Sequence, residues 1–219
     1  MSAIASERAS ADLTRAERKE RTRRRLLDGA LALVAERGFA AVGLRELARE
    51  AGITPAAFYR HFANLDELGL VLVDESFGAL GDMLREVRAN RTPPADLVDA
   101  SLDVLVRHLH DHRAHFRFLA RELAGGHSAV RQAIRKELQL FRSELAVDLA
   151  RLPFVRDWPT EDLFVLAELL VQIVVGTVQE LLELPPDDHE AEARVIAATR
   201  TKLLLIMLGL PHWQPAAAR

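Results

Sequence analysis

Residues 44–68 read LRELAREAGITPAAFYRHFANLDEL, and this stretch decides the fold. Apolar residues recur at helical spacing over its first eight positions and stop at Gly52, where a helix can end. Thr54 is a favourable N-cap residue, and Pro55 suits the first helical position, where its missing N–H has no partner. A second short helix is therefore predicted from Thr54 through Phe62. Two short helices joined by a glycine-containing turn predict a helix-turn-helix, whose second helix enters the major groove of DNA.

The second short helix carries side chains suited to DNA. Small residues let the backbone approach the bases, and alanine methyl groups can contact thymine methyl groups. These small residues are Ala56 and Ala57, and the polar donors beside them are Tyr59, Arg60 and His61. Phe58 and Phe62 lie four positions apart and are expected to anchor the helix in the core. A helical hairpin with incidental polar residues shows the same pattern, so that alternative stays open here.

Charge is distributed unevenly along the chain. A net charge of −3 argues by itself against binding to nucleic acid. Residues 1–62, however, hold 12 Lys/Arg and 8 Asp/Glu, a balance of +4, whereas residues 63–219 hold 17 and 24, a balance of −7. Much of the positive charge lies in the basic run of residues 15–25. A basic N-terminal part on an acidic body is typical of a protein whose one end meets phosphate, although a solvated charged helix gives the same count.

The rest of the chain predicts helices throughout, and therefore an all-α fold. Thr14 with Glu17 forms a capping box for the first helix, and Asn64 with Glu67 caps the fourth. Further amphipathic stretches lie near 95–112, 113–123, 127–151, 160–184 and 189–209. They are separated by Pro93-Pro94, Gly125-Gly126, the segment from Pro153 to Pro159, and Pro185-Pro186.

This pattern predicts two domains. A flexible N-terminal arm covers residues 1–13, and a three-helix DNA-binding domain with the helix-turn-helix covers 14–63. A helical domain for ligand binding and dimerisation covers 64–212, and a C-terminal tail covers 213–219. The helices near 160–184 and 189–209 are the most apolar. A helix apolar on most sides must be buried on most sides, so we expect them to form a homodimer interface, with a buried hairpin within one chain as the alternative.

Several classes of protein are excluded or disfavoured. The chain contains no cysteine, so disulfides and thiolate metal sites are excluded. Charged and polar residues interrupt every apolar run, so we expect no membrane span and a cytoplasmic protein. The histidine cluster lacks a dictated Asp, Glu or Cys partner, so no metal site is predicted; its members are His108, His110, His112 and His115. Phosphate-loop, dinucleotide and nucleophile motifs are absent, and we expect no enzyme.

Residues 44–68 closely resemble the DNA-binding signature of the TetR family of transcriptional regulators. In that signature a short helix ends in Ala-Gly, and Tyr-x-His-Phe is followed by Asn-x-x-Glu-Leu. Ala51-Gly52, Tyr59–Phe62 and Asn64–Leu68 match these positions. The resemblance implies a homodimeric repressor on a palindromic operator, with its two second helices in successive major grooves, roughly 34–36 Å apart or a little more.

The resemblance also implies roles for single residues. Phosphate contacts would fall to Thr54, Tyr59 and His61. Base contacts would fall to Arg45, Ala56, Ala57 and Arg60. The predicted DNA-binding set is completed by Arg23, Pro55 and Asn64. Many relatives carry a lysine next to the asparagine, whereas Ala63 and Leu65 flank it here, so the basic run would have to supply more of the charge.

A narrower resemblance concerns the FabR/DesT-like subgroup, which controls unsaturated fatty acid synthesis and senses long-chain acyl-CoA. Phe58–Phe62, Leu65–Leu70 and Val73–Ser76 carry it, with His115–Arg117 and Arg121-Glu122 downstream. It implies an apolar channel, an acyl-CoA effector and no other cofactor. The arginines that could meet the coenzyme's phosphates at the channel mouth are Arg117, Arg121, Arg131 and Arg135. The predicted ligand-binding residues are Phe77, Leu80, Leu84, Leu105, Leu109, Phe116, Arg117, Leu119, Arg121, Leu138, Phe141 and Val174.

Periodicity alone leaves other interpretations of the second domain open. The apolar residues could pack against one another as a helical core, and the arginines could lie on solvated helix faces. A regulator that senses another hydrophobic molecule, such as a drug or antibiotic, fits the same residues. A helical lipid-binding protein without a role at DNA is the alternative from a different class.

Overall fold

The computed structural model describes residues 14–89, 96–125 and 127–214 of the chain. All regular elements in these ranges are helical, which confirms the predicted all-α fold. The elements are α2 (Arg15–Arg37), η1 (Phe39–Ala41), α3 (Leu44–Glu50), α4 (Pro55–Phe58), α5 (Leu65–Ala89), α6 (Leu97–Asp111), α7 (Arg113–Gly125), α8 (Ser128–Leu149), α9 (Thr160–Glu183), α10 (His189–Gly209) and η2 (Leu210–His212). The predicted N-terminal arm, the break at Pro93-Pro94 and residues 215–219 of the predicted tail lie outside the described residues.

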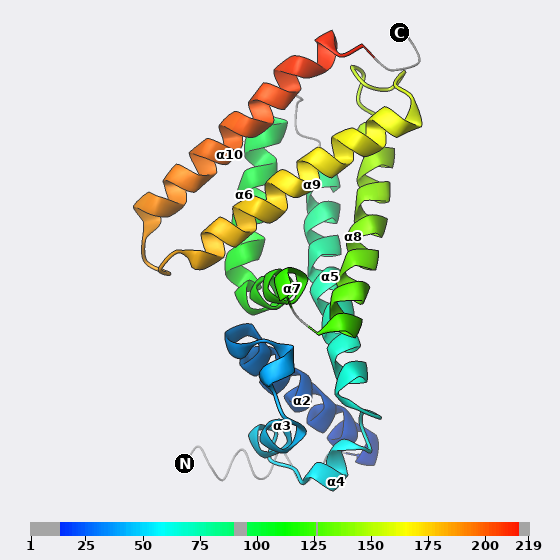
Figure 1. The fold of residues 1–219 in the computed structure, drawn as a ribbon, viewed down its shortest axis with the longest axis vertical. Coiled ribbons are helices and arrows are strands. Elements are labelled where there is room, and N and C mark those ends of the chain that lie inside the picture. The colour runs from blue at the N-terminus through cyan, green and yellow to red at the C-terminus, as the bar shows by residue number, and fades with distance from the viewer. Residues whose placement is uncertain (1–13, 90–95, 126, 215–219) are drawn as a thin grey trace.

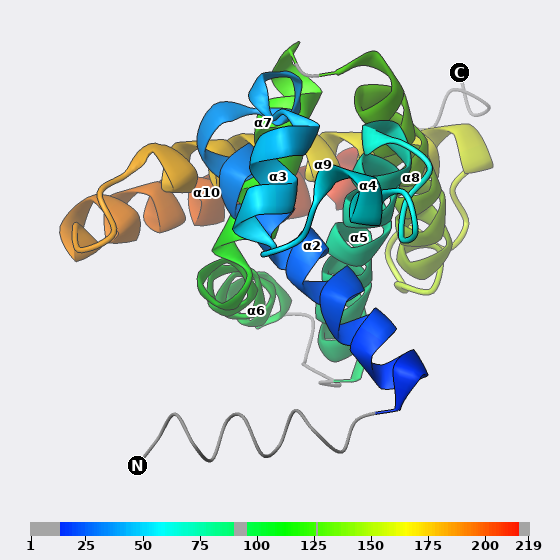
Figure 2. The same ribbon diagram turned by 90° about the horizontal axis from the view of Figure 1, so that it is seen from below.

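The molecule is elongated, with the short helices gathered at one end (Figure 1). α2, α3 and α4 form this end, which we call the N-terminal unit (residues 14–63). α5 and α8 run along the long axis away from it, and α9 and α10 cross the opposite end as a hairpin. Seen from below, α3 and α4 lie in front of the other helices (Figure 2). In the part of the chain that the structure describes, no other helix covers the helix-turn-helix from that side.

The core of the N-terminal unit continues into α5, α7 and α8. α2 buries one face because its apolar residues recur every three or four positions, and Leu26, Ala30 and Val34 are completely covered. Against this face lie the rings of Phe58 and Phe62, whose centroids are 5.7 Å apart. Both phenylalanines are buried, as the sequence predicts.

The predicted helix boundaries at the start of the chain follow from local hydrogen bonds. Thr14 and Glu17 form the reciprocal capping box that begins α2. Gly52 has a φ of 67°, in the left-handed region that favours glycine. It ends α3 in a Schellman motif, because the N–H of Ile53 donates to the carbonyl of Ala48 at 2.9 Å and the N–H of Gly52 to that of Arg49 at 3.0 Å.

α4 is shorter than predicted. The sequence pattern extends the second helix through Phe62, but regular α-helix ends at Phe58 and residues 59–61 form a turn. There the N–H of His61 donates to the carbonyl of Phe58 at 2.8 Å, a bond across three residues rather than four. Such bonds tighten the end of a helix. The N–H of Phe62 still donates to the carbonyl of Phe58 at 3.1 Å, so the turn stays wound as far as the predicted end.

Two neighbouring residues of α7 join the N-terminal unit to the rest of the molecule. The carboxylate of Glu122 is 1% exposed and accepts the N–H of Phe39 at 2.8 Å and the N–H of His127 at 2.9 Å. The Arg121 guanidinium donates to the carbonyl of Ala35 at 3.2 Å and also to that of Glu36. Glu122 therefore holds the start of η1, and Arg121 holds the end of α2.

α9 is the most apolar long helix. It is long and apolar enough to cross a membrane by length and composition, with a mean hydropathy of 1.7, although the sequence predicts no span. A single helix of this kind is weak evidence for a membrane protein, because interior helices of globular proteins have the same composition. Only 33% of its apolar window is buried within one chain. Much of α9 therefore remains available to a partner.

Candidate DNA-binding and ligand sites

The start of α4 exposes backbone and small side chains. The Thr54 hydroxyl accepts the N–H of Ala57 at 3.2 Å and so caps the helix, as predicted. Pro55 and Ala56 are exposed and Ala57 is half-buried. A surface could therefore approach this turn closely, which is what contact with base edges in a groove requires.

Tyr59 and Arg60 lie at the surface, next to the buried rings of Phe58 and Phe62. Tyr59 is 60% exposed, and its ring meets the fully buried ring of Phe58 edge-on at 5.7 Å. Arg60 is exposed as well. Because Phe58 and Phe62 fix the backbone on both sides, the phenol and the guanidinium are held at the surface without support from a regular helix.

His61 lies between α4 and α2 in a positively charged environment. Its Nδ1 atom is buried and has no hydrogen-bond partner among the described residues. Burial lowers the pKa of His61 below its ordinary value, and the positive charges of Lys19 and Arg23 lower it further. The imidazole is therefore favoured in its neutral form until a negative group approaches.

Two arginines of the basic run make contacts within the protein. Arg23 lies over the ring of Phe62, 4.5 Å from its centroid, in a cation–π contact that orients it beside α4. Arg24 forms ion pairs with Asp28 at 2.9 Å and with Glu75 at 3.1 Å. Arg24 thus ties α2 to α5, and its charge is already balanced by carboxylates.

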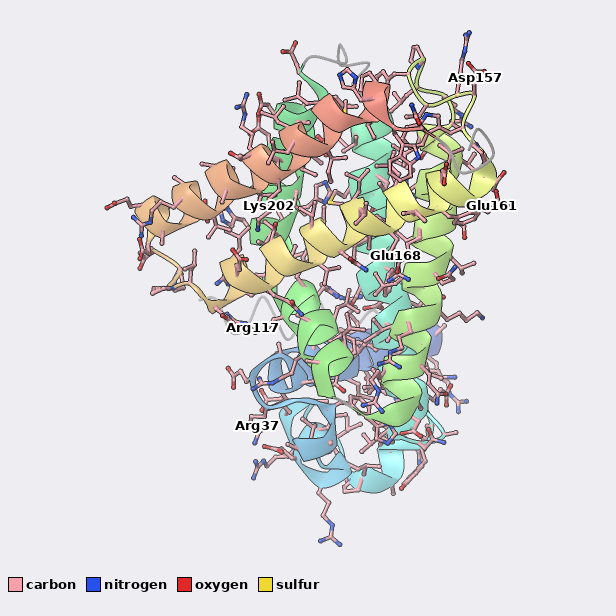
Figure 3. The ribbon with its side chains drawn as sticks, turned by 45° about the horizontal axis from the view of Figure 1, so that its top comes forward. Arg37, Arg117, Asp157, Glu161, Glu168 and Lys202 are labelled. Atoms are coloured by element: carbon pink, nitrogen blue, oxygen red, sulfur yellow. The ribbon has the colours of Figure 1, made fainter. Side chains whose placement is uncertain are left out.

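The remaining predicted DNA-binding residues flank α4. Arg45 is exposed in the first turn of α3. Next to it Glu46 pairs with Arg37 at 2.7 Å; Figure 3 labels this arginine at the outer edge of the N-terminal unit. The side-chain oxygen of Asn64 accepts the N–H of Glu67 at 2.8 Å, so it caps α5 as predicted.

The apolar residues predicted to line a channel are divided between two packed clusters. Leu119 belongs to the core that includes α2 and α4, with Phe77 and Leu138 packed against it. Leu105, Leu109 and Phe116 belong to a second core shared by α5, α6, α7, α9 and α10, with Val174 packed against it. Leu80 touches both clusters, and Leu84 and Phe141 are half-buried. These side chains contact one another, as the alternative of a helical core predicts.

Two of the predicted ligand arginines lie on α7. The guanidinium of Arg121 donates to the carbonyls at the end of α2, so this group is already bound within the protein. Arg117 is half-buried on α7, which packs against α9 (Figure 3).

A groove opens between α8 and α9, with a volume of about 500 Å³. We call it the α8–α9 groove. Its lining residues are Leu123, Arg135, Leu138, Gln139, Arg142, Val171, Gln172, Val175, Gly176 and Gln179. Leu138, from the predicted ligand set, and Arg135, one of the arginines considered for the channel mouth, are among them. The sequence does not predict the α9 wall as a ligand surface, because the apolar character of this helix favours a dimer interface.

The histidine cluster connects helices. His108 contacts Glu86 at 3.0 Å and His110 contacts Glu192 at 2.9 Å. Ser76 donates its hydroxyl proton to the carbonyl of Leu72 at 2.6 Å, so its oxygen accepts from Nδ1 of His115 at 2.9 Å. In the described ranges, no three His, Asp or Glu side chains come close enough to hold a metal ion.

Two family models match this sequence. Residues 26–70 match the bacterial regulatory proteins of the tetR family, and residues 94–203 match the tetracyclin repressor-like C-terminal domain. The chain belongs to the TetR family of transcriptional regulators. Regulators of this family bind operator DNA through the N-terminal domain and small molecules through the C-terminal one.

Solved structures of the family share the fold. A TetR-family regulator from Streptomyces coelicolor, SCO4454, has 22% identity and a TM-score of 0.64 over 84% of this chain and 95% of its own. AibR, solved with isovaleryl coenzyme A and operator DNA, has 16% identity and a TM-score of 0.64 over 83% and 97%. The fatty acid degradation regulator FadR from Bacillus halodurans has 14% identity and a TM-score of 0.63 over 84% and 94%.

Proposed function

We propose that this TetR-family chain is a cytoplasmic, homodimeric repressor that binds a palindromic operator and responds to an acyl-CoA or similar amphipathic acyl ligand. The observation that carries the DNA-binding part is the surface of α4. There Tyr59 and Arg60 are exposed beside the small residues that start the helix, while Phe58 and Phe62 are buried beneath them. Polar donors on a fixed apolar base suit contact with phosphates and base edges.

The exposed apolar side chains of the last two helices support the dimer. Val165 and Leu169 on α9 are 55% and 45% exposed, and Leu205 and Leu208 on α10 are 65% and 71% exposed. These residues share one end of the α9–α10 hairpin, because the two helices are antiparallel and Trp213, just beyond α10, bonds to Asp162 near the start of α9. Burying such a surface against a second copy would remove it from water.

The acyl ligand is supported by two relatives of similar fold. One was solved with isovaleryl coenzyme A, and another is a regulator of fatty acid degradation. A buried methylene group contributes about 0.8 kcal/mol, so a long acyl chain can supply the free energy needed to shift a two-state protein.

The proposal is tested by fluorescence anisotropy of the protein on DNA from its own upstream region. The titration is run without ligand, with palmitoyl-CoA and with palmitoleoyl-CoA. We expect tight binding that the two thioesters change unequally. Tight binding indifferent to both would retain the repressor and reject the acyl ligand in favour of another hydrophobic effector. Binding of the thioesters without any affinity for DNA would favour a lipid-binding protein.

A further inference from the structure

We infer that the α8–α9 groove binds a single-chain amphipathic anion, with its apolar chain along the floor and its anionic head at Arg135 and Arg142. This inference deepens the proposed function, because it places the effector site on this face of the C-terminal domain. Arg135 and Arg142 lie seven positions apart on α8, two helical turns, and therefore share one side of that helix. Both line the groove.

The floor of the groove suits an apolar chain. Leu123, Leu138, Val171 and Val175 contribute aliphatic side chains to it from three helices. At Gly176, no atom outside the helix lies within 4 Å of where a Cβ would be, so this part of the wall is open. A volume of about 500 Å³ falls within the range of small-molecule sites, roughly 300–1,000 Å³.

The rim of the groove is positively charged. Two arginines line it, together with three glutamines, and none of the lining residues is acidic. Arg142 forms a long ion pair with Glu168 of α9, at 3.9 Å, and this carboxylate is half-exposed outside the groove lining (Figure 3). Electrostatic complementarity therefore favours an anion over a neutral or cationic ligand.

Arg142 has donor capacity that the protein leaves unused. Its Nε atom is buried and has no hydrogen-bond partner among the described residues. Its Nη1 atom lies 3.4 Å from the side-chain oxygen of Gln139, a long bond. A guanidinium presents a planar fork that fits carboxylate and phosphate oxygens. The Arg142 side chain is 27% exposed, so an incoming anion would bind its accessible part first and would reach Nε only after the side chain turns into the groove.

The groove adjoins the surface that we assign to the dimer. Gln172 lines the groove and is also exposed on α9, close to Leu169. A ligand in the groove would therefore lie next to the partner subunit. This position lets occupancy influence the distance between the two N-terminal units without entering the packed cores.

Fluorescence of cis-parinaric acid bound to the full-length protein tests the inference directly. The probe is displaced by dodecanoate, by lauroyl-CoA and by uncharged dodecanol, so that a carboxylate head, a phosphate-bearing head and no charge are compared. We expect both anions to displace it and dodecanol to be at least about tenfold weaker, since a hydrogen bond to a charged group is lost. Equal displacement by dodecanol would overturn the assignment of the head group.

Variants locate the site. Arg142→Gln and Arg135→Gln should each weaken binding of dodecanoate about tenfold, and Gly176→Leu should block it by filling the floor. The matched controls are Arg151→Gln, which removes an exposed arginine just beyond α8, and Gly78→Leu, at a position on α5 that is equally open. Unchanged binding in all three groove variants would overturn the inference.

DNA anisotropy and sedimentation of the same variants separate this inference from the proposed function. We expect every groove variant to bind DNA in the absence of ligand and to remain dimeric. If the wild-type protein does not bind DNA, the proposed function is contradicted, and the displacement assay still tests whether the groove binds an anion. Displacement that appears only when the dimer dissociates would show that a second copy fills the groove, and would overturn the ligand assignment.

Discussion

At the scale of single residues, neighbours in α4 differ sharply in exposure. Phe58 is fully buried and Tyr59 is 60% exposed. The sequence predicts the burial of Phe58, because Phe58 and Phe62 lie four positions apart and share one helix face. It also places Tyr59, one position after Phe58, on a different face of the helix. The position of His61 could not be predicted, since it depends on the approach of Lys19 and Arg23 from a helix some forty residues earlier.

The phosphate and base contacts proposed for this surface make different predictions. Tyr59→Phe and His61→Ala should weaken binding to operator and to unrelated DNA alike, because phosphates are the same in every sequence. Arg45→Ala should reduce discrimination at one base pair by about 1–3 kcal/mol. Anisotropy titrations against single-base operator variants measure both effects. An Arg45→Ala protein with unchanged sequence preference would show that this arginine does not contact a base.

The lowered pKa of His61 predicts how DNA binding depends on pH. Phosphate groups near the imidazole would raise its pKa, so the complex would take up a proton. Operator affinity should therefore increase as pH falls from about 7.5 to about 5.5, through the ordinary histidine pKa. In His61→Ala this increase should diminish, whereas His212→Ala, far from the N-terminal unit, should retain it. Identical profiles for the wild type and His61→Ala would argue against phosphate contact.

Protein stability should change with pH in the opposite direction. Because the pKa of His61 is lower in the folded protein than in the unfolded chain, the unfolded chain binds more protons below about pH 6.5. The contribution of His61 to stability is therefore fully present above that value and is lost as pH falls through the lowered pKa.

At the scale of elements, α5 approaches its neighbours most closely at Gly69. A Cβ there would lie 2.7 Å from the ring of Phe39 and 2.8 Å from the side chain of Val130. Glycine weakens a helix interior, so sequence patterns do not explain its presence in the first turns of α5. The structure does, because η1 and α8 meet the helix at this point.

This close approach predicts opposite effects for two glycine substitutions in the same helix. Gly69→Ala should destabilise the protein by about 1–3 kcal/mol through overpacking. Gly78→Ala should be neutral or stabilising by about 0.5–1 kcal/mol, because its Cβ would meet open space. Thermal unfolding followed by circular dichroism measures the difference. A melting temperature for Gly69→Ala equal to that of Gly78→Ala would show that the neighbours can move aside.

At the scale of the whole molecule, the helices followed from periodicity and capping residues, but their mutual contacts did not. Leu105 and Leu119 were both predicted to line an apolar channel, yet they lie in different packed cores. The contacts of Arg121 with α2 and of Glu122 with η1 could not be predicted either, because charged residues near a helix end are usually exposed to solvent. Which faces meet depends on tertiary packing, and helix pattern does not encode it.

The dimer assigned to α9 and α10 makes a prediction at this scale. Leu208→Glu places a charge on the proposed interface, and we expect sedimentation velocity to show a monomer. Operator affinity should fall as well, because the two half-sites are no longer bound by linked domains. Val147→Glu serves as the control, since Val147 is 59% exposed on α8, outside the assigned interface. A Leu208→Glu dimer together with a Val147→Glu monomer would move the interface to α8.

The central claim, that the N-terminal unit binds DNA, is tested most directly by the salt dependence of operator affinity. Neutralising several phosphates releases counterions, so the logarithm of the association constant should fall linearly with the logarithm of salt concentration, with a slope of about −0.9 per contact. We predict a steep slope for the wild type, a shallower one for Arg23→Gln, which removes one positive charge, and an unchanged slope for Tyr59→Phe, which removes none. A flat salt dependence of operator affinity for the wild-type protein would contradict DNA binding by the N-terminal unit.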